Sequence, residues 1–200
     1  MKFVLQRFLT GIFYVSFFIG CSGTDSGQAS IKNNGNKLKM GSNYSTVDYT
    51  ATILQIDKKS ENSGTWETLF TDKEFIDIYE HSSSYIDSAI RFLTDEKYSL
   101  HQKTVCIYSM QRAKLEDYVL ILEQCANLFE KEKIPELLLK RAISPTFGKK
   151  RPVIENYNDA NVKRILESIK GDGKVSQEFK TTIEKILSGE YWNNIKDSLE

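Results

Sequence analysis

The chain has 200 residues, of which 40% are hydrophobic, and its 27 Lys and Arg residues balance 27 Asp and Glu residues. This composition excludes wholesale disorder, because a chain so rich in apolar residues can form a core. The balanced charge excludes the strong basic excess that binding to nucleic acid requires, so we expect no nucleic-acid partner. The length suits one domain of ordinary size with a tail.

The first 20 residues have the organisation of a secretion signal. Lys2 and Arg7 form a short basic region, and a largely apolar stretch runs from Phe8 to Ile19. A signal peptide has an apolar run of about 7–15 residues, whereas a membrane-spanning helix needs about 20. We therefore predict a signal peptide over residues 1–20, and its removal would leave two more acidic than basic residues.

The sequence Phe18-Ile19-Gly20-Cys21 follows the apolar stretch. It resembles the lipobox of bacterial lipoprotein precursors, although Phe18 stands where such motifs usually carry Leu. The resemblance implies cleavage after Gly20 and attachment of a diacylglycerol to the thiol of Cys21, whose acyl chains would anchor the protein to a membrane. Ser22, where Asp would mark inner-membrane retention, implies the outer membrane, facing the periplasm. The alternatives are an uncleaved apolar anchor or an ordinary signal peptide beside an incidental cysteine.

Residues 21–43 are predicted to be a lipidated flexible tether. Gly, Ser and Asn dominate residues 22–41, which carry few large apolar side chains, so burial cannot offset the entropy of ordering. A flexible chain of this length spans roughly 25 Å on average. The tether would hold a single helical domain, residues 44–200, away from the membrane.

The first part of that domain has no decisive periodicity. Residues 44–57 are rich in Thr, Tyr, Val and Ile, which fits either one short strand or a first helix. Residues 58–64 are polar and predict a loop. Thr71 and Glu74 then fit a capping box at the start of a helix with Phe75 facing inward.

The rest of the chain has the spacing of amphipathic helices joined by short turns. We predict helices over 84–93, 99–112, 116–133, 135–142, 160–171, 176–189 and, as a short last helix, 190–199. Residues 144–158 contain prolines and a glycine and predict a long loop. The fold class is therefore mainly α, as an irregular helical bundle or as a short stack to which residues 158–166, faintly similar to a HEAT-repeat helix, would belong.

Cys106 and Cys125 are placed symmetrically about the turn predicted near residues 113–115. Two antiparallel helices would bring these thiols face to face, and an oxidising compartment would join them in a disulfide. The alternative is two buried free cysteines that act as small hydrophobic side chains.

No motif in the sequence predicts catalysis, a metal or a cofactor. The two histidines, His81 and His101, lack the close spacing of zinc ligands, and neighbouring acids such as Asp95 and Glu96 do not face each other on a helix. The chain has no Gly-rich phosphate loop. We expect a protein that is not an enzyme, with a hydrolase built from distant carboxylates as the least favoured alternative.

One loop is the best candidate for a partner surface. It places Phe147 beside Lys149, Lys150 and Arg151, which would suit an acidic partner or lipid headgroups. The alternative is a solvated loop whose Phe147 and Ile154 pack into the core. The function predicted from this cellular location and fold class is a membrane-tethered protein-binding module. One form would be an immunity-type protein that neutralises an envelope-targeted toxin, and the alternative is a structural or accessory envelope lipoprotein.

Overall fold

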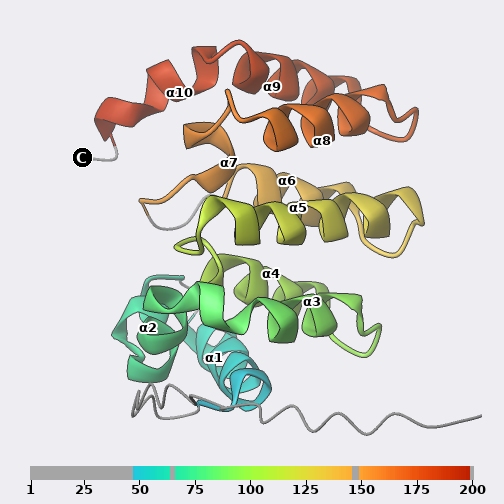
Figure 1. The fold of residues 1–200 in the computed structure, drawn as a ribbon. Helices are drawn as coiled ribbons and strands as arrows, with labels where there is room; N and C mark the ends of the chain where they lie inside the picture. The colour runs from blue at the N-terminus through green and yellow to red at the C-terminus, as the bar shows by residue number, and fades with distance from the viewer. Residues whose placement is uncertain (1–46, 64–65, 146–148, 199–200) are drawn as a thin grey trace, which may run out of the picture. The chain divides into compact units, whose positions relative to one another are not determined.

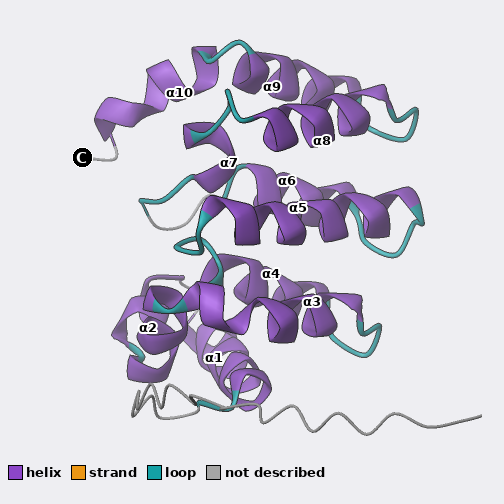
Figure 2. Ribbon diagram, viewed as in Figure 1, coloured by secondary structure: helices purple, strands orange, loops and turns teal. Residues whose placement is uncertain are grey.

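The structure, a computed structural model, describes residues 47–63, 66–145 and 149–198. Over these ranges every regular element is a helix and there is no strand (Figure 2). The predicted mainly α fold is therefore confirmed. None of the helices in the described ranges combines the length and the apolar character that crossing a membrane would require.

The helices that build the described part of the chain are α1 (Tyr49–Ser63), α2 (Lys73–Glu80), α3 (Ile86–Thr94), α4 (Leu100–Ser109), α5 (Leu115–Glu130), α6 (Glu136–Ile143), α7 (Pro152–Glu155), α8 (Ala160–Gly171), α9 (Gln177–Leu187) and α10 (Glu190–Ile195). Three short 3₁₀ segments, η1 (Trp66–Thr71), η2 (Ser82–Tyr85) and η3 (Lys196–Ser198), accompany them.

The segment with no decisive periodicity is the long helix α1. It continues through Ser63, so the loop predicted over residues 58–64 is wrong up to that point. Ile53, Ile56 and Ser60 are buried on one face of the helix, which packs against α4. Packing of this face overrides the weak helix propensity of the β-branched residues in the segment.

Polar side chains cap the N-termini of several helices. Asp72, one residue after the predicted Thr71, begins α2 by accepting hydrogen bonds from the backbone N–H groups of Glu74 and Phe75. Ser99 begins α4 in a capping box completed by the Gln102 side chain. The side chains of Asp159 and Ser176 begin α8 and α9 by accepting hydrogen bonds from backbone N–H groups of the first turn, as the sequence predicts.

Pairs of consecutive helices form hairpins, and the hairpins stack on one another within the compact unit Tyr44–Glu200 (Figure 1). The pairs are α3 with α4, α5 with α6, and α8 with α9. Between layers, α5 packs on α3 and on α8, and α6 packs on α4. Each hairpin therefore buries its apolar face against its neighbours, as helical stacks do.

The predicted long loop over residues 144–158 contains the short helix α7 in its described part. The ring of Tyr157, just beyond α7, packs against Gly189, which precedes α10 with φ +78°. A Cβ at Gly189 would lie 2.7 Å from that ring, so only glycine fits both the backbone and the contact.

Candidate functional site

The described part of the predicted partner loop leads directly into α7. Lys149 and Lys150 are exposed and Arg151 is half-buried, whereas Cys21 and Phe147 lie outside the described residues. The Arg151 backbone N–H donates to the Glu155 carboxylate at 2.7 Å, which fixes the start of α7. Burial lowers the pKa of the Arg151 guanidinium from its ordinary value. The loop thus presents its lysines to solvent and holds its arginine against the fold.

A pocket of about 280 Å³ lies beside these basic residues. One wall comes from the α4–α5 connection and the start of α5, and the other from the segment around α7. The lining residues are Gln111, Arg112, Ala113, Leu115, Lys150, Pro152, Glu155 and Asn156. Arg112 is held by an ion pair with Glu80, and the Lys150 ammonium lies 3.9 Å from the Glu155 carboxylate. Lys150 is the residue that this pocket shares with the predicted partner surface.

Gln111 is the unusual residue of this pocket. It is only 1% exposed, yet neither its amide nitrogen nor its amide oxygen has a hydrogen-bond partner in the described part of the chain. A buried amide without partners costs on the order of 1–3 kcal/mol. Gln111 lines the pocket, but both amide atoms are inaccessible to solvent, so a molecule in the pocket gains these hydrogen bonds only when the side chain turns toward it.

A second hollowed surface follows the connections within the three hairpins, which lie on one side of the stack (Figure 1). Two adjoining grooves there share Glu132, Lys133 and Ile134 of the α5–α6 connection, and a third groove shares Phe129 and Lys174 with one of them. Lys133 pairs with Glu96 of the α3–α4 connection at 2.5 Å, and Lys174 of the α8–α9 connection pairs with Glu132 at 3.0 Å. The charges of this edge mostly join one hairpin to the next.

The predicted disulfide is absent from the structure, where Cys106 and Cys125 are free, buried thiols. The prediction took α4 and α5 as the two arms of one hairpin. Instead α4 pairs with α3 and α5 pairs with α6, and the α4–α5 connection carries the chain from one layer to the next. Symmetry about that connection therefore does not place the two thiols opposite each other.

The two thiols have different surroundings. The Tyr49 hydroxyl donates to the Cys106 Sγ at 3.1 Å and lies 3.2 Å from the Ser109 hydroxyl, while the Cys106 thiol donates to the Ala89 carbonyl at 3.7 Å. The Cys125 thiol has no side-chain hydrogen bond within the described ranges. Burial raises the pKa of both thiols to about 12, so both are protonated at neutral pH.

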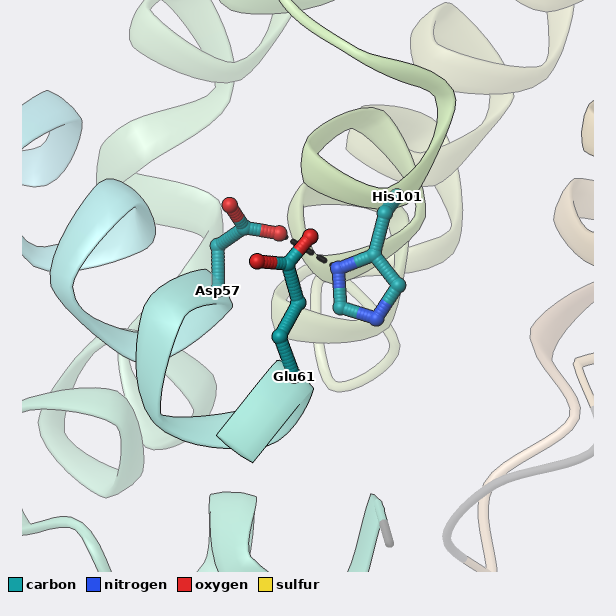
Figure 3. A group of neighbouring side chains, drawn as sticks. All are labelled: Asp57, Glu61 and His101. Atoms are coloured by element: carbon teal, nitrogen blue, oxygen red, sulfur yellow. Dashed lines mark hydrogen bonds and ion pairs between the residues drawn. The ribbon is translucent and has the colours of Figure 1, made fainter. Parts of the chain in front are cut away.

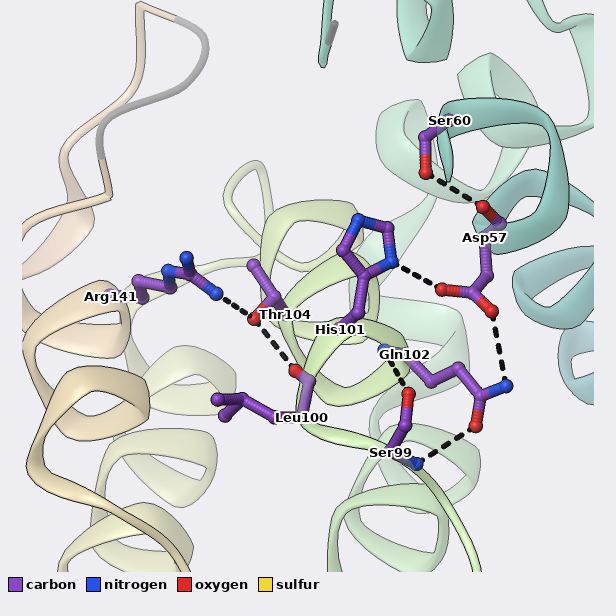
Figure 4. A network of polar contacts seen from close by, with 8 residues as sticks. All are labelled: Asp57, Ser60, Ser99, Leu100, His101, Gln102, Thr104 and Arg141. Atoms are coloured by element: carbon purple, nitrogen blue, oxygen red, sulfur yellow. Dashed lines mark hydrogen bonds and ion pairs between the residues drawn. The ribbon is translucent and has the colours of Figure 1, made fainter. Parts of the chain in front are cut away.

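A polar network that the sequence did not predict joins α1 to α4 (Figure 4). The Asp57 carboxylate interacts through Oδ1 with the His101 Nδ1, and its Oδ2 accepts a hydrogen bond from the Gln102 side chain at 3.0 Å. The Ser60 hydroxyl donates to the Asp57 carbonyl at 2.9 Å. The side chain of Asp57 is 7% exposed and that of His101 is 32% exposed, so the pair lies at the edge of the core.

Glu61 lies beside this pair (Figure 3). One ligand atom each from Asp57, Glu61 and His101 lies within 4.8 Å of the other two, a set that could hold a metal ion. The prediction of no metal ligands considered only close spacing along the chain, whereas Asp57 and His101 are 44 residues apart. The signal available in the sequence was the four-residue spacing of Asp57 and Glu61, which places both on one helix face.

Comparisons with known proteins return no match to this chain among family models, curated proteins or solved structures.

Proposed function

We propose that the chain is a membrane-tethered protein-binding module whose partner docks at the pocket beside Gln111. The unpartnered amide of Gln111 carries this proposal, because a peptide backbone offers the donor and the acceptor that the amide lacks. The neighbouring exposed Lys149 and Lys150 favour a partner segment with acidic side chains. The stacked hairpins supply a rigid support for such a surface.

The cellular location in this proposal comes from the resemblance of residues 18–21 to a lipobox. A lipid on Cys21 would hold the domain at a bacterial envelope membrane, and Ser22 favours the outer membrane facing the periplasm. Cys21→Ala should leave an unprocessed precursor that takes up no fatty acid during metabolic labelling. Labelling of that variant at the level of the unsubstituted chain would contradict the anchor.

The binding role is tested by affinity capture from envelope extract with the full chain and with Gln111→Leu. Leucine removes the donor and the acceptor at similar volume, and it relieves an unsatisfied buried amide, so the fold should persist. We expect a stoichiometric protein that the unsubstituted chain captures and Gln111→Leu does not. The proposal fails if no stoichiometric protein is captured, or if Gln111→Leu captures it equally well.

An immunity-type role is the concrete form of this proposal. A strain without the gene should then grow normally alone and be killed when a cognate envelope-targeted toxin is present. An envelope defect in the strain grown alone would favour a structural or accessory role instead.

A further inference from the structure

Asp57, Glu61 and His101 bring three metal-binding side chains together from two helices. Asp57 and Glu61 are one turn apart on α1, and His101 projects from the first turn of α4 (Figure 3). One ligand atom of each lies within 4.8 Å of the others. The Nδ1 atom of His101 faces the carboxylate side of the group, as Figure 3 shows.

The charges of the group favour a cation. Two carboxylates at positions i and i+4 of one helix repel each other. Asp57 is 5% exposed, so its charge is poorly screened by solvent. Of the two lysines beside these carboxylates on α1, Lys59 pairs with Asp72 and Lys58 is exposed to solvent. A positive ion between the two carboxylates would therefore relieve a repulsion that the fold builds into this face of α1.

The mixture of ligand types indicates which ions fit. Imidazole suits zinc, copper, iron and nickel, whereas carboxylates alone suit magnesium and calcium. Gln102 donates to the second oxygen of Asp57 and so orients that carboxylate, as partners of metal ligands commonly do. Glu61 is exposed and can rotate to close the last distance.

We propose that Asp57, Glu61 and His101 bind one divalent transition-metal ion, represented by Zn²⁺, that fastens α1 to α4. His101 binds as the neutral imidazole through Nδ1, with its proton on Nε2, and the ion replaces the Nδ1 contact with Asp57. Three protein ligands leave at least one coordination position open to water or to a ligand group from a partner.

Isothermal titration with ZnCl₂ tests the site in the full chain carrying Cys21→Ser, so that the thiol of Cys21 cannot compete for the ion. The protein is first treated with a chelator to remove any metal already bound. We expect one ion per chain and a higher melting temperature with Zn²⁺, because an ion that binds only the folded state stabilises it. Glu61→Gln removes a ligand but leaves the Asp57, His101 and Gln102 contacts in place. It should weaken Zn²⁺ binding about tenfold or more.

Two matched variants separate this site from adventitious binding. His81→Ala removes the other histidine, and Glu184→Gln removes an exposed carboxylate on α9; both should bind Zn²⁺ as the parent chain does. Titration with Co²⁺ should give visible bands without the intense thiolate charge-transfer band of a cysteine site. Zn²⁺ affinity unchanged in Glu61→Gln, Zn²⁺ affinity lost in His81→Ala, or a thiolate band with Co²⁺ would each overturn the proposal.

Discussion

The two halves of the described chain bury different kinds of side chain. In residues 47–63 and 66–111 the buried set includes eight polar or charged residues, from Thr52 to Gln111. In residues 112–145 and 149–198 the buried side chains are apolar or belong to proline, with glycine at position 189. Both halves use the same stacked hairpins, so the difference lies in the residues and not in the architecture.

This contrast distinguishes an apolar scaffold from a region whose buried polar groups can bind a ligand. A buried polar group costs free energy unless it is hydrogen-bonded, so a fold concentrates such groups only where neighbours satisfy them or a ligand does. The Asp57–His101 contact and the Gln111 amide both lie in the first half. The second half has an apolar core, and it contributes the exposed Lys150 and the segment around α7 to the pocket beside Gln111.

The strongest test of the scaffold half is Leu166→Ala on α8. Leu166 is fully buried, so truncation should lower the free energy of unfolding by about 2–5 kcal/mol through lost burial and a cavity. Leu137→Ala, at a site that is 48% exposed, should cost far less. Urea denaturation followed by circular dichroism measures both, and equal losses would show that the second half is not a packed core.

Asp57→Ala tests the polar half. The variant leaves His101 and Gln102 without their common acceptor, and we expect the free energy of unfolding to fall by about 1–3 kcal/mol in the presence of a chelator. Glu61→Ala, one turn along α1 and exposed, should leave stability nearly unchanged under the same conditions. If Asp57→Ala is as stable as the parent chain, the network does not hold α1 on α4.

Alkaline titration compares the thiols of the two halves. The folded pKa of Cys125 is raised from an ordinary value of 9.0 to about 12, so this thiol adds stability below pH 9 that is lost progressively up to pH 12. Between these pH values, each such thiol should lower the free energy of unfolding by about 1.4 kcal/mol per pH unit. In Cys125→Ala the free energy of unfolding should fall less with rising pH, by the contribution of one thiol. Urea denaturation at pH 8 and 10.5 measures this difference. An unchanged slope would show that the Cys125 thiol ionises equally readily in both states.

The smallest effect is expected at the edge formed by the hairpin connections. Lys133 pairs with Glu96 across two layers, but both side chains are more than half exposed. Exposed pairs contribute little because water and salt screen them. Lys133→Ala should leave the melting temperature unchanged within error in a thermal scan, and a clear decrease would mean that the connections themselves hold the layers together.

Much of the helical pattern was predictable from local signals. The positions of Asp159 and Ser176 marked the starts of α8 and α9, and the spacing of Val162, Ile165 and Leu166 identified the buried face of α8. These signals depend on residues within one or two turns of each other. They carry no information about which helices pair, and the assumed α4–α5 hairpin therefore gave the wrong arrangement of Cys106 and Cys125.

The candidate sites were harder to predict for the same reason. Lys149 and Lys150 were predicted as a surface from composition alone, but the pocket beside them needs Gln111, which lies 39 residues before Lys150 in the chain. Asp57 meets His101 only because α1, whose helical state the sequence left open, packs on α4. Both sites depend on tertiary contacts between elements that local periodicity treats separately.

The layered packing of the hairpins also determines how the domain should lose structure. Because each layer contacts chiefly the layers beside it, opening can spread from one layer to the next without a single global event. α10 has no buried residue and packs on α9, on the adjoining η3 and on α7, so its amide hydrogens should exchange first with deuterated solvent. Amides of α3 and α5, which form the most extensive contact between layers, should exchange last.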